Sequence, residues 1–240
     1  VDEVTFLLRS QFVSIVGNVG LVIPVVLALA ALLALAGWDG VMTPAKAEGI
    51  LAHHHLLGPT ALFAAATGVL LFLSSLIAGW VENWFVFHRL DAAIAYHPRA
   101  TRLLGAARAR RWAAYWRDHI SGWAANISLG LMLGLVPPVL GFFGLPFEVR
   151  HVTLVAGQLA AATHELGWGA LHSPALWWAV AGMAACGVLN VAVSFALAFR
   201  LALAAQNVRG VGRRRVYAAL FSRLRRQPLA FVLPVTPRHR

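Results

Sequence analysis

The sequence predicts an all-α membrane protein, a polytopic transmembrane helical bundle with about four spans, a short re-entrant or interfacial helix, and amphipathic basic segments. Of its residues, 60% are hydrophobic and only 12% are charged, whereas roughly a quarter are charged in a soluble domain. The apolar residues also gather into runs of about 20 or more, long enough to cross a hydrocarbon layer about 30 Å thick as helices. This pattern excludes a water-soluble fold with a conventional core.

The first two spans are predicted at about residues 12–37 and 60–87. The second closes on Trp80 and Trp84, which form the aromatic belt typical of a membrane interface. The connection between the two spans begins near Pro44 and carries three consecutive histidines. We expect this polar connection to lie outside the membrane.

A basic segment, residues 89–119, follows the second span and contains seven arginines against two aspartates. Wound as a helix, it places Trp112 and Trp116 on one face and Arg110 and Arg117 on the other. This pattern predicts an amphipathic helix at the membrane surface.

The third span is predicted at about residues 123–147 and the fourth at about 175–199. Pro137 and Pro138 lie in the second half of the third span, where the missing backbone N–H groups should kink or break the helix. An apolar piece between these spans, residues 152–162, is too short to cross and is expected to be re-entrant or interfacial.

Gly130 and Gly134 lie four residues apart in the third span. This spacing allows two helix backbones to approach closely in lipid. It is compatible with homo-oligomerisation and equally with packing inside one bundle.

The tail of the chain is strongly basic, with ten arginines and no acidic residue between Arg200 and Arg240. Because cytoplasmic loops carry the excess of Lys and Arg, residues 89–119 and both chain ends are expected in the cytoplasm, with the spans in a bacterial inner membrane. We therefore divide the chain into a transmembrane domain, residues 1–205, and a basic cytoplasmic tail, residues 206–240. Anionic lipid headgroups are the favoured partners of these arginines and nucleic acid the less favoured ones. The assigned headgroup contacts are Arg108, Arg110, Arg111, Arg213, Arg214, Arg215, Arg225 and Arg226.

Polar side chains within or beside the spans are the candidates for function, because each must be satisfied in lipid. They are Asn18, Glu82, Asn83, Asn126, Arg150, His151 and Asn190. Asn18, Asn126 and Asn190 either hydrogen-bond between helices or line a polar cavity. The Glu82-Asn83 pair is either a headgroup-depth carboxylate paired with a loop arginine, or a proton or substrate site. The Arg150-His151 pair either caps the following helix or binds an anionic headgroup.

Chemistry beyond these candidates has little support in the sequence. Six histidines lie in the predicted outer connections, but their spacing matches no metal motif, so no metal site is predicted. No cofactor motif and no catalytic constellation is recognisable. The single cysteine, Cys186, lies in an apolar run and is expected to be a small packing residue.

Several stretches resemble the membrane region of the bacterial proteins labelled site-specific recombinase. They are Gly17-Asn18, residues 73–79 before Glu82-Asn83, residues 144–153, and residues 189–195. The similarity covers nearly the whole chain. It implies a longer parent protein with a mostly helical soluble region upstream, and the start of the chain at Val1 fits that expectation.

The label implies DNA recombination. A tyrosine recombinase needs a tyrosine nucleophile surrounded by arginines and histidine, but this chain has no His-x-x-Arg motif. A serine recombinase needs an activated serine in a soluble domain, but Ser74, Ser75 and Ser194 are embedded in apolar spans. Catalytic residues of the parent would then lie upstream. We predict a multi-pass inner-membrane module that anchors or scaffolds a larger protein. One alternative is a small-molecule or lipid-handling protein with a polar intramembrane cavity, lined by Asn18, Asn126, Asn190 and the broken third span. The other alternative is a DNA recombinase, as the family label states.

Overall fold

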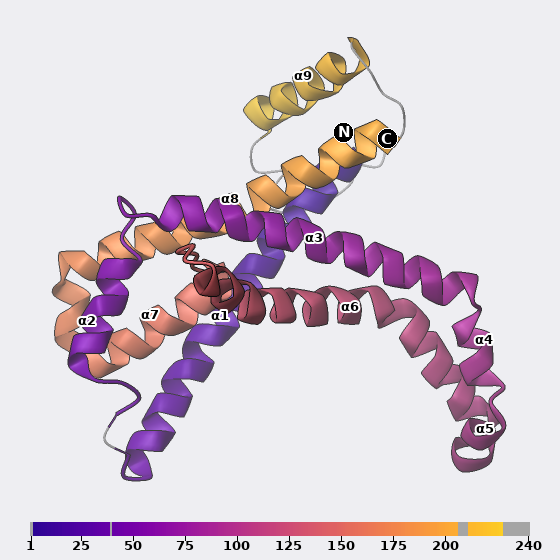
Figure 1. Cartoon of the computed structure of the whole chain (residues 1–240), viewed down its shortest axis with the longest axis horizontal. Coiled ribbons are helices and arrows are strands. Elements are labelled where there is room, and N and C mark those ends of the chain that lie inside the picture. The colour runs from indigo at the N-terminus through magenta and orange to yellow at the C-terminus, as the bar shows by residue number, and fades with distance from the viewer. Residues whose placement is uncertain (1, 39, 206–210, 228–240) are drawn as a thin grey trace. The chain divides into compact units, whose positions relative to one another are not determined.

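The fold is all-α, as predicted. The computed structural model describes residues 2–38, 40–205 and 211–227, and 86% of these residues lie in helices, with no strand among them (Figure 1). Residues 206–210 and 228–240 of the predicted tail lie outside the described part.

Four of the described helices are long and apolar enough to cross a membrane: α1 (Asp2–Leu35), α3 (Thr60–Phe87), α6 (Ala106–Phe142) and α8 (Pro174–Ala205). At 1.5 Å per residue, the shortest of them is about 40 Å long, which exceeds the roughly 30 Å of the hydrocarbon layer. By length and composition the chain is therefore a multi-pass membrane protein, and many large apolar side chains are exposed along these helices.

The third span differs from its prediction in two ways. Helix α6 begins at Ala106, so the first part of the span and the amphipathic basic segment form one continuous helix rather than two. Pro137 and Pro138 do not break it, and the helix continues to Phe142. The prolines lie within the last two turns, where few further backbone hydrogen bonds remain to be lost.

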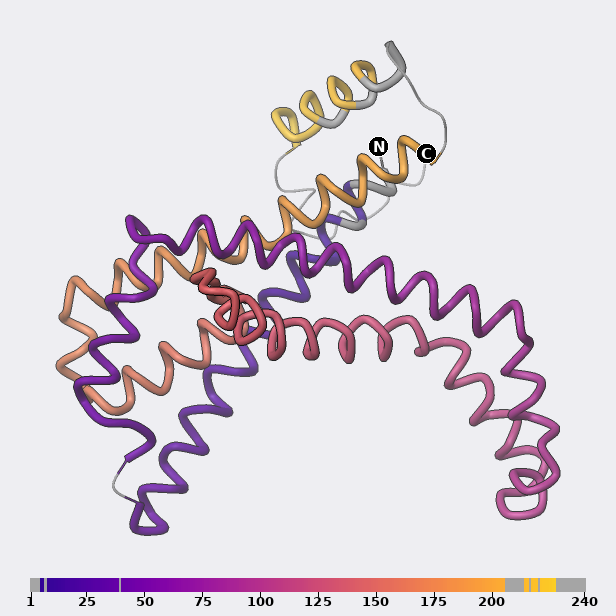
Figure 2. Tube along the Cα trace, viewed as in Figure 1, coloured from indigo at the N-terminus to yellow at the C-terminus, as the bar shows by residue number. Residues whose placement is uncertain are grey.

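The chain divides into two compact units, residues 1–66 with 150–240, and residues 67–149. In the first unit, two short helices, α2 (Pro44–His53) and α7 (Val152–Leu166), pack together and against α8, and α7 also packs on α1 (Figure 2). The 3₁₀ turn η1 (Trp168–His172) connects α7 to α8. Helix α9 (Val211–Arg226) is the last described element.

Helix α7 is the short helix expected between the last two spans. It is about 22 Å long, too short to cross. Seven of its side chains are buried among α1, α2 and α8, so it packs inside the first unit.

The second unit contains most of α3, the short helices α4 and α5, and α6. Helices α4 (Leu90–Ala95) and α5 (Pro98–Leu104) pack on the first turns of α6, and Gly105, with φ of 79°, makes the turn between α5 and α6. Ala109 and Ala113 of α6 are buried in this packing. An exposed ion pair, Arg117 to Asp91 at 3.4 Å, bridges α6 and α4.

Candidate functional site

A buried polar cluster lies where α2, α7, α8 and the start of α3 meet in the first unit. We call it the Arg150 cluster, and it consists of His54, Arg150, Gln158, Cys186 and Asn190. Arg150 and Asn190 are each only 2% exposed, and His54 is 4% exposed. Of the seven polar candidates from the sequence, the structure brings together Arg150, His151 and Asn190.

The Arg150 guanidinium binds the imidazole of His54. Nη1 of Arg150 donates to Nδ1 of His54 at 2.5 Å, and Nε2 of His54 lies 2.7 Å from Oε1 of Gln158. A guanidinium carries donors only, so Nδ1 must accept and the ring proton must be on Nε2, which then donates to Gln158. The hydrogen-bond network therefore assigns His54 as the neutral Nε2–H tautomer.

Asn190 connects three segments through its amide. Its Nδ2 donates to the backbone carbonyl of Ala64 at 2.8 Å and to that of Arg150 at 3.0 Å. Its Oδ1 accepts from the backbone N–H of Val152 at 3.2 Å. One side chain on α8 thus holds the first turn of α3, the turn before α7 and the beginning of α7.

The N-terminus of α7 is capped from α8 and not from its own sequence. His151 occupies the N-cap position of α7 but makes no side-chain capping hydrogen bond. The expected cap by Arg150 and His151 is therefore wrong, because Asn190 supplies the acceptor instead. Arg150, the candidate for binding an anionic headgroup, is buried and donates to His54.

Small residues on α8 allow α2 and the turn before α7 to pack closely against this helix. The thiol of Cys186 is fully buried and lies 2.6 Å from the carbonyl oxygen of Arg150. A Cβ atom added to Gly182 would overlap the carbonyl oxygen of His54. Together with Asn190, these residues recur every four positions and form the face of α8 that receives the two short helices.

His151 sits beside the cluster, outside the membrane-length helices. Burial lowers the pKa of His151 from its ordinary value of 6.5, because an imidazolium is poorly solvated there. The neutral form of this side chain is therefore favoured in the folded chain.

The other four polar candidates do not join the cluster. Asn18, Glu82, Asn83 and Asn126 are exposed on their helices. Asn126 donates to the carbonyl of Gly122 in its own helix at 2.9 Å, and the described residues offer Glu82 no arginine partner. The predicted pairing of Glu82 with a loop arginine is not seen, and Arg117 pairs with Asp91 instead. Helix α6 continues past its two prolines, so the expected break in the third span is not present.

His54 and Gln158 were missed by sequence reasoning. His54 was counted among the outer loop histidines, but it caps the C-terminus of α2 and is buried there. The available signal was the Thr43-Pro44 helix start, where the Thr43 hydroxyl accepts from Lys46 N–H at 3.3 Å. A helix that begins there places Ala47, Leu51 and His54 on one face.

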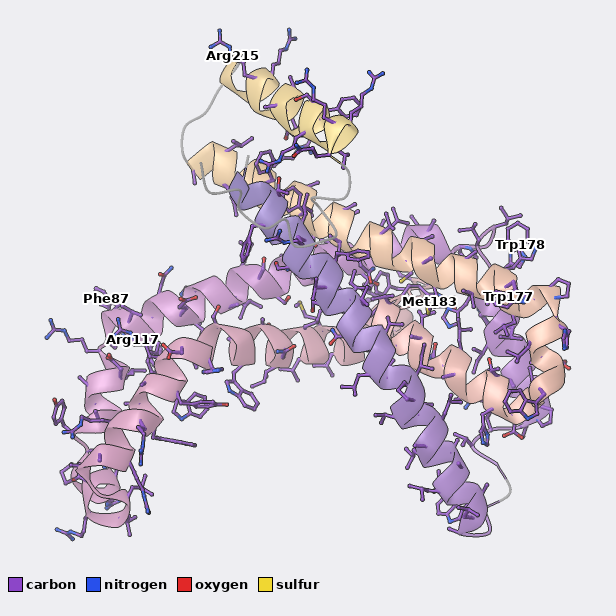
Figure 3. All side chains as sticks on the ribbon, turned by 180° about the vertical axis from the view of Figure 1, so that it is seen from behind. Phe87, Arg117, Trp177, Trp178, Met183 and Arg215 are labelled. Atoms are coloured by element: carbon purple, nitrogen blue, oxygen red, sulfur yellow. The ribbon has the colours of Figure 1, made fainter. Side chains whose placement is uncertain are left out.

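No metal centre is found among the described residues, because no three His, Cys, Asp or Glu side chains gather there to bind one. The arginines assigned to lipid headgroups lie on α6 and α9, and those with described side chains are exposed. They are Arg108, Arg110, Arg111, Arg214, Arg215, Arg225 and Arg226; the side chain of Arg213 lies outside the described part. Figure 3 shows Arg215 pointing outward from α9.

Comparison with known proteins identifies a family. A family model with the description "Site-specific recombinase" matches residues 1–234. No curated protein and no solved structure matches the chain.

Proposed function

The chain belongs to the site-specific recombinase family, and on this premise we propose that it is a multi-pass inner-membrane module that anchors a larger protein, with its basic helices held on the anionic cytoplasmic leaflet. The membrane part of the proposal rests on the four membrane-length helices. The anchoring part rests on α9.

Helix α9 combines an apolar face with a basic one. Tyr217, Phe221 and Leu224 recur at helical spacing and are 45%, 69% and 48% exposed. Arg215 and Arg226 lie on the opposite face by helical geometry. An exposed apolar face opposite arginines is typical of a helix lying in the headgroup region of a bilayer.

The position of α9 along the chain supports the same role. The ring of Tyr217 packs edge-on against Phe199, near the end of α8, with centroids 5.6 Å apart. This contact holds α9 beside the end of a membrane-length helix, where the bilayer interface is expected. Each arginine near an anionic leaflet contributes about 1 kcal/mol of attraction.

The start of α6 offers a second basic and aromatic surface. Trp112 and Tyr115 stack with centroids 5.9 Å apart, and Tyr115 stacks on His119 at 4.4 Å. Aromatic rings of this kind concentrate at membrane interfaces. Arg108 and Arg111 are exposed near this face and are suited to contact headgroup phosphates.

The anchoring proposal is tested by limited trypsin digestion of the full chain in sealed vesicles. Cleavage after the α9 arginines, followed by mass spectrometry, should be slower in vesicles containing phosphatidylglycerol than in purely zwitterionic ones, and high salt should remove the difference. Replacing Phe221 and Leu224 by Ser should also remove the protection. Equal cleavage in both vesicle types at low salt would contradict the proposal.

The family description points to DNA recombination, which is the competing function. The same vesicles, titrated with specific and scrambled duplexes over a salt series, separate the two. Sequence-dependent DNA binding that persists at physiological salt would favour recombination. Weak binding that is lost as salt is added would instead favour the role of the arginines as contacts to lipid headgroups.

A small-molecule or lipid-handling role is favoured by one observation, the Arg150 cluster itself. Ionisable side chains inside a membrane bundle are costly and commonly mark functional sites. Labelling of single cysteines placed around the cluster by a water-soluble reagent tests whether water reaches it; complete protection would argue against a ligand cavity.

A further inference from the structure

We propose that the contact between His54 and Arg150 is a proton-sensitive latch, which holds the end of α2 against the turn before α7 at neutral pH and releases it in acid. The latch goes beyond the anchoring role and is independent of lipid charge. It rests on the hydrogen bonds around His54.

The latch requires His54 to be neutral. In the closed state Nδ1 accepts from the Arg150 guanidinium at 2.5 Å, and the Nε2–H group donates to Gln158 at 2.7 Å. A proton added to His54 must occupy Nδ1, since Nε2 already carries one. That proton replaces the acceptor by a donor, and it places an imidazolium against a guanidinium.

The surroundings of His54 make this conflict costly. The turn before α7 contributes the cation of Arg150, α7 contributes the neutral amide of Gln158, and α8 contributes Gly182, which has no side chain. On the start of α3, Thr60 donates its hydroxyl to the carbonyls of His53 and His55.

The ionisable neighbours in the chain are three histidines and one acid, Glu148, which lies two residues before Arg150. His53 precedes His54 and is exposed, while His55 follows it and stacks on Trp178 of α8 with centroids 5.0 Å apart. His151 follows Arg150 and is partly buried. Two like charges in contact within a buried site of low dielectric repel strongly.

The direction of the pH effect follows from proton linkage. The open state binds the additional proton and the closed state does not, so the closed state is favoured as the pH rises. Once His54 is protonated in the open state, the equilibrium between closed and open states changes about tenfold for each pH unit. An unperturbed histidine titrates near pH 6.5, so release is expected as the pH falls from neutral into the acidic range.

Opening of the latch has a readout already present in the chain. Cys186 is the single cysteine, is fully buried, and contacts the carbonyl of Arg150, whose side chain forms the latch. When α2 and the turn before α7 separate, a small reagent reaches this thiol. Figure 3 labels Met183, which lies on α8 three residues before Cys186 in the sequence.

The experiment measures modification of Cys186 in the full chain, reconstituted in vesicles equilibrated at pH 8 to 5. Dithiodipyridine is the probe because it reacts with thiols in acid as well as at neutral pH. The reference is His54→Gln, whose amide can accept from Arg150 and donate to Gln158 but cannot be protonated. Dividing the two rates at each pH removes the intrinsic pH dependence of the reaction.

The expected ratio of the wild-type rate to the His54→Gln rate is near one at pH 8 and rises toward tenfold per pH unit in acid. The matched control His55→Gln should behave as wild type. A ratio that stays flat to pH 5, or a rise that disappears in His55→Gln instead, would overturn the latch.

A second variant keeps the test decisive if His54→Gln does not fold. Gln158→Glu retains His54 and places a carboxylate at its Nε2–H group, which allows the closed state to hold the added proton as well. The closed and open states then differ less in the number of protons they bind, so the rise of Cys186 modification in acid should be shallower than in the wild type. A rise as steep as in the wild type would count against the latch.

Discussion

Asn190 on α8 caps the N-terminus of α7: its Oδ1 accepts from the backbone N–H of Val152 at 3.2 Å, where the preceding His151 supplies no capping side chain. A helix that begins inside a bundle has unsatisfied N–H groups and no water to bind them. A buried amide from the neighbouring helix solves this problem, and it does so while its Nδ2 binds two carbonyls.

Asn190→Ala should therefore destabilise the chain by roughly 2–4 kcal/mol, because it leaves several buried backbone groups without partners. Unfolding by SDS in mixed micelles, followed by circular dichroism, measures the change. Asn18→Ala is the matched control, since Asn18 is exposed on α1, and it should alter stability by less than about 0.5 kcal/mol. Similar losses in both variants would mean that the Asn190 hydrogen bonds contribute little.

Gly182→Ala should cost about 1–3 kcal/mol or more, because the new Cβ overlaps the carbonyl of His54 and α2 must move away. Gly130→Ala is the control, as nothing lies within 4 Å of a Cβ at that position. There the gain in helix propensity should stabilise the chain by about 0.5–1 kcal/mol. The same unfolding measurement compares the two, and a Gly182 variant as stable as wild type would show that α2 does not pack on α8 this closely.

The sequence foretold the long helices and their approximate positions, since a run of about 20 apolar residues has few alternatives to a membrane span. The start of α6 at Ala106 was not predicted. The charged residues Arg117 and Asp118 lie just before the apolar run of the third span, but they do not interrupt the helix. Hydropathy indicates whether a segment lies in lipid or in water. It does not locate the end of a helix, because the backbone hydrogen bonds continue from one environment into the other.

The cluster was only half predictable for a related reason. Asn190 could be chosen from sequence, since a buried amide in a span must find partners. Arg150 was also a candidate, but its contact with His54 could not be predicted, because the two residues are 96 positions apart and meet only through packing. Sequence periodicity describes one helix at a time and contains no information on such pairs.

The folded chain should lose stability in acid partly through His151. Burial lowers the pKa of this side chain below 6.5, so the unfolded chain takes up the proton more readily. The stabilising contribution is then present above pH 6.5 and is lost as the pH falls. In His151→Gln the decline of stability between pH 7.5 and 5.5 should be shallower than in the wild type, with the exposed His164→Gln as control. Parallel curves for all three would contradict this.

The hairpin of α4 and α6 should depend on packing more than on its ion pair. The Arg117 and Asp91 side chains are 63% and 33% exposed, and pairs of this kind contribute about 0–1 kcal/mol. Ala109 is fully buried, so Ala109→Leu should overpack the contact at a cost of about 1–3 kcal/mol. Amide hydrogen exchange in α4 should accelerate more in Ala109→Leu than in Asp91→Asn; the reverse order would give the ion pair the larger role.

The ends of α1 and α7 should face the same side of the membrane. Glu165, near the end of α7, lies so close to Gly40 that its carboxylate oxygens would be 2.7 and 2.9 Å from a Cβ there. Helix α7 begins at the Asn190 amide, about 24 Å along α8 from Pro174, so it covers only part of the bilayer depth before returning. A membrane-impermeant thiol reagent should therefore label Trp38→Cys and Trp168→Cys from one side of sealed vesicles, and Ser222→Cys on α9 from the other. Cys186, which is fully buried, is the internal control and should stay unlabelled at neutral pH. Labelling of Trp38→Cys and Trp168→Cys from opposite sides would mean that α7 crosses the membrane and that the re-entrant arrangement is wrong.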